Sequence, residues 1–125
     1  MTVRRIHQNS KLLIIDPYVV RLKHSDGHIG LDYSAFRKTL KLAKEMCLKT
    51  WAYSNPEYEE RALSKEEANT LGLFAGMNWH TELASYWAFT DREDALQFRL
   101  TLGESAKQVH IWPSNIAYTI FEMEE

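Results

Sequence analysis

Hydrophobic and polar positions alternate most clearly from Leu83 to Phe89, in the sequence LASYWAF. Because successive side chains of a strand point to opposite faces, Trp87 and Phe89 should share one face, and Tyr86 and Ala88 the other. Both faces are mostly apolar, which is typical of a central strand that other elements cover. We therefore predict a central β-strand over residues 83–89.

A helix is predicted directly after this strand, over residues 91–102. Thr90 and Glu93 have the T-x-x-E spacing of a capping box, and Gly103 is the type of residue that ends a helix. Between them, apolar residues recur at helical spacing. The stripe consists of Ala95, Phe98 and Leu102, widened by Leu96 and Leu100, with Gln97 and Arg99 pointing outward.

An amphipathic helix is also predicted over residues 33–47. Its apolar stripe consists of Phe36, Leu40, Ala43 and Cys47. Its opposite face is basic and consists of Arg37, Lys38, Lys41 and Lys44. Such a face is usually only solvated, and it favours nucleic-acid binding where other basic residues converge on it.

Further runs, rich in β-branched and aromatic residues, predict strands over residues 18–23, 49–53, 108–112 and 116–122. Residues 11–15 are a strand candidate too, and with 18–23 they form either one edge strand bent at Asp16-Pro17 or two consecutive short strands. Residues 108–112 and 116–122 should form a hairpin through Pro113-Ser114-Asn115. The acidic segment at residues 54–78 has a helical pattern with a second capping box at Ser64 and Glu67, so we predict a helical insertion there.

Without the insertion and the last strand, the order of these elements is βαββαβ, the ferredoxin-like arrangement. We therefore predict a single α+β domain over residues 1–125, with a ferredoxin-like antiparallel sheet and two helices on one face. The helical insertion and an extra C-terminal strand are additions to it. The opposite sheet face is either open, and then available for binding, or covered by the insertion.

The formal net charge of −2 hides an uneven distribution. Residues 1–49 contain ten Lys/Arg and four Asp/Glu, a balance of +6, whereas residues 50–125 contain five and thirteen, a balance of −8. This asymmetry predicts a polarised surface. The single cysteine, Cys47, is typical of a reducing compartment. No apolar run could span a bilayer and no signal-peptide pattern is present, so we expect a cytoplasmic protein without membrane contact.

Candidate chemistry is sparse, because the chain contains none of the glycine-rich phosphate-binding or nucleophile motifs. His24, Asp26 and His28 lie around a predicted turn, but a metal site needs three or four ligands, and the only thiol is expected to be buried. We therefore predict no metal and no cofactor. A small-ligand binder or enzyme stays an alternative, with His24, Asp26, His28 or His80 in a pocket between the insertion and the sheet.

Aromatic residues near the C-terminus provide a candidate protein interface, made of Trp112, Tyr118 and Phe121. Two helices cannot cover both faces of the sheet, and exposed apolar patches usually mark contact sites. We therefore predict a homodimer or higher oligomer whose interface includes the final strand, residues 116–121, or the open sheet face. If the 54–78 insertion covers that face instead, the protein is a monomer.

Residues 86–103 combine an aromatic strand, an acidic turn with Asp-Ala, and a helix end of the form Phe-(Lys/Arg)-Leu-x-x-Gly. The residues concerned are Tyr86, Trp87, Phe89, Asp91, Asp94, Ala95, Phe98, Arg99, Leu100 and Gly103. In these features the chain resembles small uncharacterised phage-encoded α+β proteins. The resemblance implies a virus-encoded protein that acts inside an infected bacterium, and it implies no particular activity.

An aromatic-rich fold without catalytic motifs favours a non-enzymatic binding protein. As a phage accessory factor, it would engage a host or viral protein or associate with itself. The first alternative is a nucleic-acid-binding protein that uses the basic face of the 33–47 helix, assisted by Arg4 and Arg5. The second alternative is the small-ligand binder or enzyme with a histidine-containing pocket.

Overall fold

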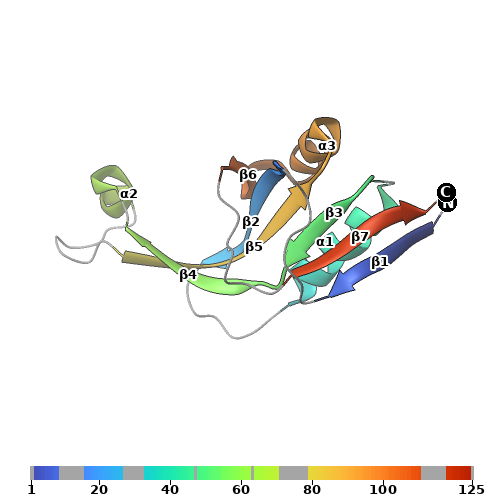
Figure 1. The fold of residues 1–125 in the computed structure, drawn as a ribbon. Coiled ribbons are helices and arrows are strands. Elements are labelled where there is room, and N and C mark those ends of the chain that lie inside the picture. The colour runs from blue at the N-terminus through green and yellow to red at the C-terminus, as the bar shows by residue number, and fades with distance from the viewer. Residues whose placement is uncertain are drawn as a thin grey trace.

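The computed structural model describes residues 2–8, 16–26, 33–46, 48–62, 64–70, 79–110 and 118–124. In these residues one antiparallel sheet of seven strands is accompanied by three α-helices (Figure 1). The predicted α+β class is confirmed. The order across the sheet is β1-β7-β3-β5-β2-β6, and β4 pairs with β5 outside this path.

The strands are β1 (Thr2–Gln8), β2 (Tyr18–Asp26), β3 (Trp51–Ser54), β4 (Glu57–Ala62), β5 (Trp79–Phe89), β6 (Ala106–Val109) and β7 (Tyr118–Glu124). The helices are α1 (Ser34–Glu45), α2 (Lys65–Thr70) and α3 (Arg92–Leu102). A short 3-10 helix, η1 (Gly103–Ser105), leads from α3 into β6.

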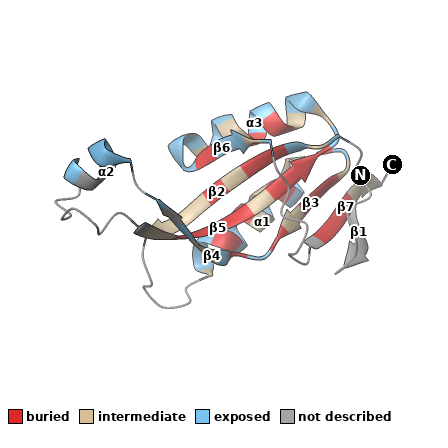
Figure 2. Ribbon diagram, turned by 60° about the vertical axis from the view of Figure 1, so that its left-hand side comes forward, coloured by how far each residue is buried: buried red, intermediate tan, exposed pale blue. Residues whose placement is uncertain are grey.

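The central strand is β5, as the alternation of residues 83–89 predicts. It pairs with β2 along one side and with β3 and β4 along the other. The main core lies on one face of the sheet, where α1 and α3 both contribute to it (Figure 2). This core consists of Val20, Leu22, Phe36, Ala43, Leu48, Trp51, Trp87, Phe89, Ala95, Phe98, Ala106 and Phe121.

Aromatic rings fill the space between the sheet and the two helices. The Trp87 ring lies 5.0 Å from that of Phe98 in α3 and 6.0 Å from that of Phe36 in α1. It also stacks on Tyr53 of β3, with ring centroids 5.4 Å apart. The Trp87 indole N–H donates a 2.8 Å hydrogen bond to the Ser85 hydroxyl, so this buried polar atom has a partner.

The second face of the sheet carries smaller side chains. Val19, Ala52, Ala88 and Ile120 form a compact buried cluster there, with Tyr86 and Val109 packed against it. The predicted division of the β5 side chains is thus confirmed, with Trp87 and Phe89 on the helix-covered face and Tyr86 and Ala88 on the other.

Both long helices lie where their periodicity predicts. Phe36 and Ala43 of α1 and Ala95 and Phe98 of α3 are buried, and Gly103 ends α3 with a left-handed φ of 73°. The predicted capping box at Thr90 is wrong. The Thr90 hydroxyl donates to the Thr50 carbonyl at 3.1 Å, because β3 lies beside the end of β5 and offers it an acceptor.

The predicted helical insertion at residues 54–78 differs from the structure. Residues 57–62 form β4, which continues the line of β3 along β5, and a helix covers only residues 65–70. The Ser64–Glu67 capping box is confirmed by hydrogen bonds of 3.1 and 3.3 Å. Helix α2 lies beyond the end of the sheet, at the tip of the β4–β5 pair (Figure 1).

The predicted hairpin of the last two strands is also wrong. Strand β6 pairs with β2, and β7 pairs with β1 and β3, so three strands separate them in the sheet. The turn residues 113–115 and the predicted strand 11–15 lie outside the described residues. Strand β1 has no predicted counterpart, because its seven residues are mostly polar or basic.

His24 gives the fold a pH dependence. Its Nε2 lies 2.7 Å from the Ser85 hydroxyl and its ring contacts Phe36 edge-on. Burial lowers the pKa of His24 from 6.5 to about 4, so between these pH values the unfolded chain binds more protons. The contribution of neutral, buried His24 to the free energy of unfolding is therefore complete above pH 6.5 and is lost as the pH falls towards 4.

We expect the free energy of unfolding to fall by about 1–2 kcal/mol from pH 7 to pH 4.5 on account of His24. This is less than the full pKa shift implies, because solvent screens a partly exposed ring. Urea denaturation of the wild type and His24→Gln should show the smaller pH dependence in the variant. His110→Gln, at an exposed position, is the control, and equal pH dependence in all three proteins would contradict this role.

Candidate functional site

The basic face predicted for the first long helix lies on the surface of α1. Arg37, Lys38, Lys41 and Lys44 are all exposed, and the Lys44 ammonium lies 5.1 Å from the centre of the Phe121 ring. Arg5 of β1 is exposed and pairs in register with Phe121. Arg5 therefore lies on the same sheet face as α1, next to the ring that Lys44 covers.

The described residues predicted for a protein interface are not available on the surface. Phe121 is only 6% exposed and stacks on Trp51 with ring centroids 4.7 Å apart, so it belongs to the core and offers no surface to a partner. Strand β7 is hydrogen-bonded on both sides, so it cannot pair edge to edge with a second copy. Trp112 and the side chain of Tyr118 lie outside the described residues.

The two described histidines of the predicted pocket have different neighbours. His24 lies against the helix-covered core, whereas His80 of β5 is 3.9 Å from a carboxylate oxygen of Glu82. His28 and the side chain of Asp26 lie outside the described residues. Within the described ranges, no group of three histidine, cysteine or acidic side chains is arranged to hold a metal ion, and no helix is long and apolar enough to cross a membrane.

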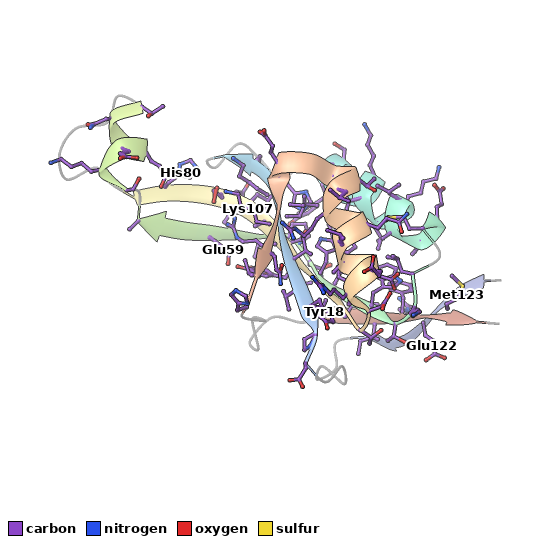
Figure 3. All side chains as sticks on the ribbon, turned by 90° about the horizontal axis from the view of Figure 1, so that it is seen from above. Tyr18, Glu59, His80, Lys107, Glu122 and Met123 are labelled. Atoms are coloured by element: carbon purple, nitrogen blue, oxygen red, sulfur yellow. The ribbon has the colours of Figure 1, made fainter. Side chains whose placement is uncertain are left out.

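A hollow of about 600 Å³ does lie between β4, α2 and the sheet. We call it the charged hollow. It is lined by Arg21, Lys23, Glu59, Glu60, Glu67, Glu82, Tyr86, Glu104, Ser105 and Lys107. Glu59 and His80, labelled in Figure 3, both belong to the β4–β5 pair beside it.

An ion-pair network organises the floor of the charged hollow. Arg21 donates from Nε to Glu59 at 3.0 Å and from its terminal nitrogen to Glu82 at 3.2 Å. The Tyr86 hydroxyl donates to the Glu59 carboxylate at 2.7 Å. Burial alone lowers the pKa of Arg21, but its hydrogen bond and charge interaction with Glu59 outweigh that effect and raise it. Burial also raises the pKa of Tyr86, as does its bond to Glu59.

The charged groups of this network therefore pair with one another, Arg21 with Glu59 and Glu82. Glu82 is 3% exposed, and a carboxylate at such a position requires cationic or hydrogen-bonding partners. Arg21 supplies such a partner from the neighbouring strand: it pairs with Tyr86 in the β2–β5 register, and its long side chain reaches along the sheet to Glu82. We interpret this group as a structural clamp between β2, β4 and β5.

A second surface lies between α3 and the edge strand β6. Three large hydrophobic side chains are exposed in the described part of the chain: Tyr18 at 38%, Leu96 at 42% and Leu100 at 74%. Leu96 and Arg99 line two neighbouring hollows of about 810 and 170 Å³, one shared with Leu100 and the other with Tyr18. All three exposed side chains thus follow one continuous surface.

We call this surface the α3–β6 strip and define it by Tyr18, Leu96, Arg99, Leu100, Lys107 and Gln108. In Figure 3, Tyr18 lies towards the N-terminal end of α3 and Lys107 towards its C-terminal end. The sequence pattern assigned Leu96 and Leu100 to the buried stripe and Arg99 to the outside. The structure reverses this for the leucines, because β6 is the last strand of the sheet and leaves their side of α3 uncovered.

We expect Arg21→Met to lower the free energy of unfolding by about 3 kcal/mol, because it leaves the buried Glu82 carboxylate without its arginine. The double variant Arg21→Met/Glu82→Gln should recover part of this loss. Lys107→Met removes an exposed cation from the rim of the same hollow and should change stability by less than about 0.5 kcal/mol. Urea denaturation at neutral pH measures all three, and equal losses for Arg21→Met and Lys107→Met would refute the clamp.

Comparison of the chain with protein-family models, with curated proteins and with solved structures found no match. No relative therefore supplies an activity or a set of site residues. A function for the basic face of α1, the charged hollow or the α3–β6 strip has to rest on the chemistry of these surfaces.

Proposed function

We propose that the protein is a non-enzymatic binding protein that engages another protein through the α3–β6 strip. The observation that carries this proposal is the clustering of exposed apolar side chains. The three large hydrophobic residues with the most solvent contact in the described ranges lie on one surface. Scattered exposed leucines need no explanation, but contiguous ones beside hollows are typical of contact sites.

The charged hollow supports an enzyme less well. Its best-placed carboxylates, Glu59 and Glu82, are both engaged by Arg21. A general acid or base must be able to exchange a proton with a substrate, and the hydrogen bonds from Arg21 already occupy an oxygen of each of these carboxylates. The arrangement therefore favours structure over catalysis, and the exposed strip is the better candidate for function.

We further infer that the fold is ferredoxin-like. The neighbouring strands β6-β2-β5-β3 are antiparallel, and α1 follows β2 whereas α3 follows β5. This is the strand order of a βαββαβ unit with both helices on one face, and β1, β4 and β7 are additions to it. In such a fold the edge strand beside the second helix is well placed for contacts.

The resemblance of residues 86–103 to phage-encoded proteins supports a partner from an infected bacterium. A phage accessory factor that works in the host cytoplasm would contact a host protein, another viral protein or a second copy of itself. Self-association through the final strand is not part of this proposal, because both sides of β7 are paired within the chain. A dimer would instead use the strip.

We expect Leu96→Asp/Leu100→Asp to abolish partner binding, because two charges replace the apolar centre of the strip. Tagged wild-type protein and variant are compared as baits in bacterial lysate, with quantitative mass spectrometry of the captured proteins. A genuine partner should be depleted at least about tenfold with the double variant. Light scattering of each bait, against the monomer mass of 14.6 kDa, identifies a second copy as the partner.

The matched control is Gln97→Asp, which adds a charge to the exposed face of α3 but lines neither hollow. It should capture the same proteins as the wild type. Circular dichroism checks that all three baits are folded. Equal capture by wild type and the leucine variant, or no capture together with a monomeric mass, would refute the proposal.

Nucleic-acid binding by α1 is a second candidate, and a specific observation favours it. Arg5 lies on the sheet face that α1 covers, beside the ring under Lys44, so basic residues from two elements converge. The side chain of Arg4, the other arginine predicted to assist this face, lies outside the described residues.

If this second function holds, the Arg37→Ala/Lys41→Ala/Lys44→Ala variant should bind oligonucleotides at least about tenfold more weakly than the wild type. Wild-type affinity should also fall steeply with salt, because each phosphate contact releases counterions. Fluorescence polarisation with single-stranded and duplex probes at low salt measures both effects. Arg92→Ala, on α3, is the control for general charge, and undiminished binding by the triple variant would exclude this surface.

A further inference from the structure

We propose that the α3–β6 strip takes an extended, acidic peptide segment of a partner protein, which adds to the sheet as a new strand beside β6. This inference rests on the proposed function, since it specifies the kind of segment that the strip would bind. Three features carry it: the unpaired edge of β6, the spacing of the exposed leucines and the charge of the surrounding side chains.

The first feature is the edge of the sheet. In the described part of the chain, β6 is hydrogen-bonded only to β2 and ends the strand order. Lys107 and Gln108 in its middle are exposed, and no described strand pairs with its outer side. An edge strand presents unpaired backbone N–H and C=O groups, and an extended peptide can satisfy them by strand addition.

The second feature is how α3 lies along that edge. One hollow brings Arg92 and Leu96 together with Gln108, and the other brings Leu100 and Gly103 together with Ala106. Helix α3 therefore runs alongside β6 in the opposite direction, and its exposed leucines overhang the place where an added strand would lie.

The spacing of these leucines suits a strand. Leu96 and Leu100 are four residues apart, which is about 6 Å along a helix axis. Side chains at alternate positions of a strand are about 6.7 Å apart on one face. Two apolar side chains at positions i and i+2 of the added strand would therefore meet the two leucines, while the residue between them faces away.

The third feature is charge. Apart from Lys23, which also lines the acidic charged hollow, the strip and its two hollows are lined by three cationic residues, Arg92, Arg99 and Lys107, against the single carboxylate of Glu104. Among the described residues, Arg99 donates one hydrogen bond of 3.5 Å, to Gln108, and its buried Nε has no acceptor. Carboxylates on the incoming segment would complement this surplus, so the segment should be acidic as well as apolar.

The test begins with peptides rather than with an unknown partner. An mRNA-displayed library of random dodecapeptides is selected on the full-length wild-type protein, and each enriched peptide is then tested for binding to Leu96→Asp/Leu100→Asp. Enriched sequences should contain apolar residues at i and i+2 flanked by Asp or Glu. Arg92→Glu/Lys107→Glu should weaken binding of such a peptide at least about tenfold, whereas Lys41→Glu on α1 should change it by less than about twofold.

Strand addition has its own readout, which is N-methylation of single peptide bonds. An added strand uses the N–H groups of alternate residues. N-methyl groups should therefore weaken binding about tenfold at every second position and have little effect at the positions between. Backbone amide signals of Lys107, Gln108 and Val109 should shift on binding in nuclear magnetic resonance spectra, and those of α1 should not.

The outcomes separate this inference from the proposed function. Leucine-dependent peptides that tolerate N-methylation at every position would overturn strand addition. Leucine-dependent peptides that are apolar and basic would overturn the acidic partner. In both cases the strip would still be a protein-binding surface. Selected peptides that bind the leucine variant as well as the wild type would overturn both proposals. The alternating N-methyl pattern together with loss of binding in Arg92→Glu/Lys107→Glu would support the full inference.

Discussion

The packing of Trp87 is the interaction on which the other elements depend. Its ring contacts Phe36 of α1 and Phe98 of α3 on the helix side, and Trp51 and Tyr53 of β3 beside it. One side chain of the central strand thereby fixes both helices relative to the sheet. Because a fully buried aromatic contributes several kcal/mol, α1 and α3 are held mainly on this face. In the described part of the sheet, β6 is the edge strand, paired with β2 and adjacent to α3.

Local periodicity predicts those parts of the structure that local physics determines. The alternation through Trp87 and Phe89 identified β5 and its two faces, and helical spacing identified α1 and α3. Gly103 was predictable for a similar reason, since a left-handed φ is far easier for glycine than for other residues. Each of these features depends on side chains within a few positions of one another.

The sequence could not predict which strands become neighbours. The turn residues after β6 suggested a hairpin, but β7 pairs instead with β1 and β3, far away along the chain. The same limit applies to the candidate site. Leu96 and Leu100 fit a buried stripe in any helical projection, and only the position of β6 at the sheet edge leaves them exposed. The one sequence feature that could have indicated exposed leucines is the width of the apolar stripe on this helix, because a sheet on one side covers only part of so wide a stripe.

Charge illustrates the same point. The basic and acidic halves of the chain do not form two poles, because β2 from the basic half lies between β5 and β6 from the acidic half. Arg21 is consequently neutralised by Glu59 and Glu82 across the neighbouring strands. Lys23 and Lys107 line both the charged hollow and the strip, so they form a cationic boundary between the two. An acidic segment on the strip would be attracted to this boundary, and the carboxylates of the charged hollow beyond it would repel such a segment.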